Sequence, residues 1–129
     1  MIKVNLYSSS RYAVSRKKIR DCAVKFLYSK GINHAQVDVS IVGERKISQL
    51  NQASLKHEGA TDVLSFPHHE KDKLQEVPLP PQVPPHLGDV VICFPEAVKT
   101  AKRYGKFVDD QICFYLEHSL MHLLGYHHQ

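Results

Sequence analysis

His118 and His122 stand four residues apart in a segment whose apolar spacing predicts a helix. Residues four apart lie on the same face of a helix, so the two imidazoles can bind one ion. Gly125 follows where this helix is expected to end, and a glycine there can adopt the left-handed conformation that reverses the chain. The reversal can carry His128 toward the same point. The sequence therefore predicts a metal site made of His118, His122 and His128.

Three neutral imidazoles leave one position of a divalent ion open, which is typical of a catalytic zinc site. Zinc lowers the pKa of a water in that position to about 7, which makes a hydroxide available at neutral pH. Metzincin proteases share this ligand spacing, but they have a glutamate general base directly after the first histidine. Ser119 occupies that position here. The pattern favours a metal-dependent hydrolase, with a metallopeptidase as the less favoured alternative.

Length and composition limit the class of protein. The 129 residues fit one domain, 1–129, that can bury a core without disulfides. Lysine and arginine number 17 against 13 acidic residues, and the pI near 9.0 favours a polyanionic partner. The three cysteines, Cys22, Cys93 and Cys113, lie far apart in apolar runs and are expected to be reduced thiols. We expect a cytoplasmic protein, or one of an organelle matrix, without a membrane partner.

Apolar periodicity predicts an α+β domain with helices packed on a mixed sheet of four strands. The expected strands are residues 2–6, 37–41, 61–67 and 88–93, and the expected helices are residues 15–31, 43–53, 96–104 and 107–124. The first strand, helix and strand indicate a right-handed crossover between parallel strands. Residues 68–87 are rich in proline and are expected to form either a flap near the metal site or a plain surface loop. A basic patch is expected from Lys99, Lys102, Arg103 and Lys106.

Three blocks of sequence resemble the YbeY family of metal-dependent endoribonucleases. The first block is Leu50-Asn51 followed by residues 61–67, TDVLSFP. The second is residues 87–92, LGDVVI, and the third is residues 118–128, HSLMHLLGYHH. Their order and spacing agree with the family over nearly the whole chain. The metal motif taken alone would be weak evidence, and the TDVLSFP block makes the resemblance specific.

The resemblance implies a zincin-like fold with one zinc ion on His118, His122 and His128. It also implies cleavage of single-stranded RNA, in which a metal-activated water attacks a phosphodiester. The resemblance further implies a role in ribosomal RNA maturation and ribosome quality control. Ribosomal RNA and, further, ribosomal subunits are therefore the expected partners.

One departure from the family pattern concerns phosphate binding. The family has an arginine at the position of Leu55, and leucine cannot bind a phosphate. Either Lys56 supplies the charge, or the chain is a slower or altered nuclease. The alternative function is a metal-stabilised RNA-binding or ribosome-binding module with weak or no nuclease activity.

Lys56, Asp62 and Ser65 are the candidate substrate-binding residues. An edge strand beside a metal can offer backbone groups to an extended strand of RNA, which favours Asp62 and Ser65. Asp62 has a second interpretation, because metal-bound imidazoles usually need a hydrogen-bonding partner that orients them. The sequence identifies no general base, and attack by the 2′-hydroxyl of the RNA itself stays open.

Overall fold

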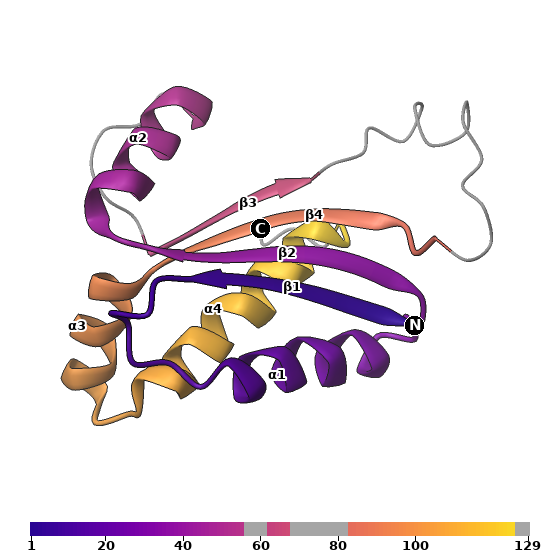
Figure 1. Ribbon diagram of the computed structural model, residues 1–129, viewed down its shortest axis with the longest axis horizontal. Coiled ribbons are helices and arrows are strands. Elements are labelled where there is room, and N and C mark those ends of the chain that lie inside the picture. The colour runs from indigo at the N-terminus through magenta and orange to yellow at the C-terminus, as the bar shows by residue number, and fades with distance from the viewer. Residues whose placement is uncertain (56–61, 68–82, 126–129) are drawn as a thin grey trace.

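The structure is a computed structural model, which describes residues 1–55, 62–67 and 83–125 (Figure 1). Its sheet has four strands in the order β1-β2-β4-β3. The strands are β1 (Ile2–Ser8), β2 (Ala35–Val42), β3 (Val63–Pro67) and β4 (His86–Cys93). Strands β1, β2 and β4 run parallel, and β3 pairs antiparallel with β4 at one edge. The predicted mixed four-stranded sheet is confirmed.

Helices α1 (Arg16–Ser29), α3 (Phe94–Tyr104) and α4 (Val108–Leu123) lie on one side of the sheet, and α2 (Glu44–Leu55) lies on the other (Figure 1). Helix α1 makes the predicted crossover between the parallel strands β1 and β2. It begins where the sequence suggests, because the Ser15 hydroxyl accepts a hydrogen bond from the amide of Lys18. No helix in the described part of the chain is both long enough and apolar enough to cross a membrane.

Two apolar clusters hold the layers together, one on each face of the sheet. The larger joins β1, β2 and β4 to α1, α3 and α4, with Val37, Val39 and Val90 fully buried. The smaller consists of Ile47, Leu64, Val91 and Cys93 and lies between α2 and the sheet. Since alternate strand residues point to opposite faces, the same strands supply both clusters.

Helix α4 is fixed in rotation by its inner face. Ile112, Leu116, Leu120 and Leu123 are buried in the larger cluster, as their spacing predicts. Burying each of these side chains contributes about 1.5–3 kcal/mol, so the helix has one strongly preferred orientation. That orientation turns the neighbouring face of α4, which carries the histidine pair, toward the edge strand β3.

Most element boundaries differ from the sequence-based expectation by one or two residues, and two of these differences concern β3 and β4. Strand β4 begins at His86, inside the segment expected to be irregular, because its first residues pair with β2. Residues 68–82 lie outside the described residues, so the choice between flap and surface loop is open there. Strand β3 begins at Val63, after Asp62, and Thr61 also lies outside the described residues.

Candidate metal centre

His118 and His122 lie on successive turns of α4 with their rings close together. Their Nε2 atoms are 3.1 Å apart, and the ring centroids are 4.7 Å apart. A tetrahedral zinc with Zn–N distances of about 2.0–2.1 Å places two ligand nitrogens about 3.3 Å apart. The pair therefore fits a shared zinc ion with little adjustment.

The third predicted ligand, His128, lies outside the described residues. The turn that was expected to lead to it begins at Gly125, which has a φ of 91°. This is the left-handed conformation that glycine adopts without strain. The predicted left-handed conformation of Gly125 is thus present, while the chain reversal and the ligand role of His128 stay predictions.

The histidine pair lines a cavity of about 490 Å³ between α4 and β3. Asp62 and Ser65, the candidate substrate residues within the described part of the chain, line the same cavity together with Phe114. The structure thus brings four of the predicted site residues to one place, although it tests none of their roles. Lys56 lies outside the described residues, and so does the side chain of Leu55.

Ser119 does not face solvent at this site. It is fully buried, and its hydroxyl shares a short hydrogen bond with the hydroxyl of Ser65 on β3. The position at which metzincins hold their general base therefore serves here to join β3 to α4. The sequence alone did not reveal this contact, because it depends on how β3 lies against α4, which no motif specifies.

A second cavity, of about 630 Å³, adjoins the first and shares Asp62, Phe114 and Tyr115 with it. Arg103 and Lys106, two members of the predicted basic patch, line this second cavity. The Lys106 ammonium lies 5.2 Å from the centroid of the Phe114 ring, and 55% of Phe114 is exposed. An exposed aromatic ring therefore borders the cavity of the histidine pair, and positive charge lies in the adjoining cavity.

Among the described residues, one group of three metal-ligating side chains lies close together, and it is a different one: Asp38, His86 and Asp89. This group was not predicted from the sequence. The available signal was an aspartate within each of two neighbouring strands, where aspartate is uncommon.

Comparison with known proteins identifies the family. The sequence model of the family described as Endoribonuclease YbeY matches residues 5–129. The chain belongs to the YbeY family. The resemblance carried by the three sequence blocks is therefore confirmed.

Several curated YbeY proteins are similar to this chain. The Endoribonuclease YbeY of Anaeromyxobacter sp. (strain Fw109-5) is 37% identical over 113 residues, which are 88% of this chain and 54% of the relative. That of Thermus thermophilus is 34% identical over 112 residues, which are 87% of this chain and 76% of the relative. The chain spans about half the length of the first relative and 33% of the length of the relative from Myxococcus xanthus.

A solved structure has a similar fold. The solution structure of TM1509 from Thermotoga maritima matches all of this chain and 75% of its own, with a TM-score of 0.61 and 24% sequence identity. This similarity concerns the fold, and it agrees with the single α+β domain described above.

Proposed function

We propose that this chain is a zinc-dependent endoribonuclease that cleaves single-stranded RNA during ribosomal RNA maturation. The observation that carries the proposal is the 3.1 Å separation of the His118 and His122 Nε2 atoms, at the wall of an open cavity in a chain of the YbeY family. The names of the curated relatives support the reaction class, hydrolytic cleavage of RNA.

In this proposal His118, His122 and His128 hold the ion as neutral imidazoles. When bound, zinc lowers the pKa of a coordinated water and polarises a phosphodiester oxygen. Helix α4 keeps the two described ligands on adjacent turns, so they need little reorganisation on metal binding. Asp62 and Ser65 lie at the β3 wall of the same cavity, where they can contact the bound strand.

The RNA strand is proposed to extend from the histidine pair across Phe114 toward Arg103 and Lys106. Proteins that bind single-stranded nucleic acid combine positive groups along the backbone path with aromatic rings on which bases stack. Phe114 borders both cavities, and the two cations line the second. These cations contact phosphates at a distance from the cleaved bond, so they do not replace the arginine that the family has at the position of Leu55.

Peptide cleavage is disfavoured, because Ser119 stands where a protease holds its general base and is buried against Ser65. The RNA-binding module without cleavage is the second candidate, and Leu55 is the observation that favours it. An assay that measures binding and cleavage on the same RNA separates the two functions.

The test measures zinc content by mass spectrometry and cleavage of single-stranded ribosomal RNA for the wild type and His122→Ala. His34→Gln is the matched control, since His34 directly precedes β2 and its ring contacts the N-terminal amine of Met1. We expect His122→Ala to lose cleavage and one zinc ion per chain relative to the wild type, and His34→Gln to keep both. Wild-type protein that is loaded with zinc and binds RNA without cutting it would contradict the nuclease and favour the binding module.

The chemistry of the product ends tests the attacking group. A 5′-phosphate with a 3′-hydroxyl is expected if water attacks the phosphodiester. A 2′,3′-cyclic phosphate would mean that the RNA 2′-hydroxyl attacks, and would overturn this part of the proposal.

A further inference from the structure

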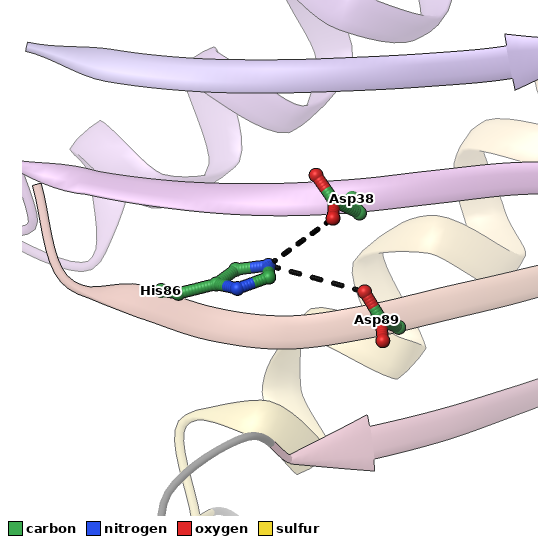
Figure 2. Close-up of side chains that lie close together, drawn as sticks. All are labelled: Asp38, His86 and Asp89. Carbon is green, nitrogen blue, oxygen red and sulfur yellow. Dashed lines mark ion pairs between the residues drawn. The ribbon is translucent and has the colours of Figure 1, made fainter.

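Asp38, His86 and Asp89 converge on the face of the sheet opposite α4 (Figure 2). We propose that these three side chains form a second metal site, which takes a divalent first-row cation such as Mn²⁺ or Zn²⁺. The site is separate from the histidine pair, because α4 packs on the other face of the sheet. It therefore goes beyond the proposed nuclease centre.

An irregularity in β4 creates the group. Residues His86 and Asp89 are three apart, so in a regular strand their side chains would point to opposite faces. The pairing with β2 shifts at this point: Gln36 is opposite His86 and Val37 is opposite Gly88, which leaves Leu87 as an extra residue. Leu87 packs against the larger apolar cluster, on the face of the sheet that α4 covers. This β-bulge turns His86 to the same face as Asp89, and bulges often re-aim a side chain in this way.

The distances within the group suit a metal ion. The His86 Nε2 atom lies 3.5 Å from Asp38 Oδ2 and 3.9 Å from Asp89 Oδ1, and Figure 2 shows it between the two carboxylates. Ligand atoms about 2.1 Å from a tetrahedral or octahedral ion are about 3.0–3.4 Å apart. The three ligand atoms all lie within 4.8 Å of one another, so inward movements of at most about 1.4–1.8 Å close the group on an ion of this size.

The neighbouring strands orient the first of these carboxylates. Asp38 Oδ1 accepts a 2.7 Å hydrogen bond from the side-chain amide of Asn5 on β1, which leaves Oδ2 turned toward His86. Asn5, Asp38 and Asp89 are partners in one row across β1, β2 and β4. Hydrogen bonds of this kind hold metal ligands in place and typically contribute about 10- to 100-fold in affinity.

Charge and access also favour a cation. Two carboxylates directly opposite each other on adjacent strands repel, and a cation between them removes that repulsion. The Asp38, His86 and Asp89 side chains are 27%, 24% and 37% exposed, so an ion can enter from solvent. Asp38 and Asp89 also border a cavity of about 480 Å³, which provides room for water or a further ligand on the ion.

The donor set indicates the kind of cation. Carboxylates suit Mn²⁺ and Mg²⁺, whereas imidazoles favour zinc and the later transition metals. One imidazole with two carboxylates therefore accepts Mn²⁺, and a site of three imidazoles holds that ion weakly. Mn²⁺ is for this reason the probe that distinguishes the second site from the histidine pair of α4.

The test titrates the metal-free chain with Mn²⁺ and follows the free ion by electron paramagnetic resonance. We expect one Mn²⁺ per chain in the wild type and in His118→Ala/His122→Ala. In Asp38→Asn and Asp89→Asn we expect the affinity for Mn²⁺ to fall at least about tenfold. Losing a ligand should lower the affinity more than losing a hydrogen bond that orients one. Asp21→Asn is the matched control, an exposed carboxylate on α1, and should bind as the wild type does.

Two outcomes would overturn the second site: unchanged Mn²⁺ affinity in both Asp38→Asn and Asp89→Asn, or loss of binding in His118→Ala/His122→Ala. The second of these would move the ion to α4 and leave the proposed nuclease centre intact. Each Asn variant relieves the repulsion between the two carboxylates in the metal-free state, so it should stay folded. Urea denaturation without metal checks this and excludes unfolding as the cause of lost binding. Paramagnetic broadening of amide signals should centre on Asp38 and Asp89, and broadening centred on His118 would count against the proposal.

Discussion

The hydroxyl groups of Ser65 and Ser119 share a hydrogen bond that ties the edge strand β3 to the helix carrying His118 and His122. Ser119 is fully buried, so removing Ser65 as its partner leaves a polar group in an apolar setting. We expect Ser65→Ala and Ser119→Ala each to lower the free energy of unfolding by about 1–3 kcal/mol. Urea denaturation measures this, and the double variant should be less destabilised than the sum of the two. Additive losses would contradict a direct bond between the hydroxyls.

Gly88→Ala should destabilise the fold severely. Gly88 has a φ of +153°, and an added Cβ would run into the Phe66 carbonyl and come within 2.9 Å of Leu123. Backbone strain and overpacking together predict a loss of about 2–5 kcal/mol in urea denaturation. Gly31→Ala is the control, because Gly31 has a φ of +79° with nothing within 4 Å of an added Cβ. Gly31→Ala should lower the free energy of unfolding by only about 1–2 kcal/mol. Equal losses in the two variants would show that the close contacts at Gly88 are relieved.

Zinc should stabilise the protein through α4. A ligand at about 100 times its dissociation constant adds about 2.7 kcal/mol to the free energy of unfolding, and chelation removes this contribution. We expect zinc to raise Tm in an Asp38→Asn background, in which the second site is disabled. Adding His122→Ala should abolish the rise. A rise that survives His122→Ala, measured by calorimetry, would place the stabilising ion elsewhere.

Phe114→Ala and Lys106→Ala should weaken RNA binding in different ways. Loss of stacking on Phe114 is expected to cost about 1–3 kcal/mol at every salt concentration. Loss of the Lys106 charge should reduce the slope of log K against log salt by about 0.7, the value for one phosphate contact on a single strand. Fluorescence anisotropy with a labelled single-stranded RNA measures both. Lys17→Ala, on the exposed face of α1, is the control; a loss equal to that of Lys106→Ala would mean that net charge alone drives binding.

Cys113 should be the most reactive of the three thiols. A hydrogen bond from the Cys22 thiol and the positive charge of Lys18 lower the pKa of Cys113. The same hydrogen bond and burial raise the pKa of Cys22, and burial raises the pKa of Cys93. Cys113 therefore has the largest thiolate fraction at a given pH and should be alkylated first. Peptide mass spectrometry after iodoacetamide treatment checks the order.

Cys22→Ala provides the matching test for this thiol. It removes the hydrogen bond that stabilises the Cys113 thiolate, so alkylation of Cys113 should become slower at mildly alkaline pH. Faster alkylation would show that Cys22 acts by covering Cys113 and not by lowering its pKa.

Most of the fold could be predicted from the sequence because its elements follow local rules. The spacing of Ile112, Leu116 and Leu120 identifies the inner face of α4, and the alternation of Val37 and Val39 identifies β2. The convergence of His118 and His122 follows from the same helical period. Features governed by a period of about 3.6 or 2 residues can therefore be predicted from the sequence alone.

Features that depend on how distant segments align could not be predicted in this way. The bulge at Leu87 arises from pairing with Gln36 and Val37, which lie far away along the chain, and it alone brings His86 beside Asp89. The bond between Ser65 and Ser119 likewise depends on how β3 lies against α4. No periodic pattern in a single sequence indicates how such distant segments align.

The place of β4 between β2 and β3 has a consequence for how the chain matures. It is the last strand of the sheet to be synthesised, so the unit made of β1, α1 and β2 has an open inner edge until Cys93 has emerged. Completion of the sheet is therefore a late, non-local event, which topologies of this kind undergo slowly. The imidazoles of α4 emerge later still, so a nascent chain cannot acquire the predicted catalytic ion before its scaffold is available.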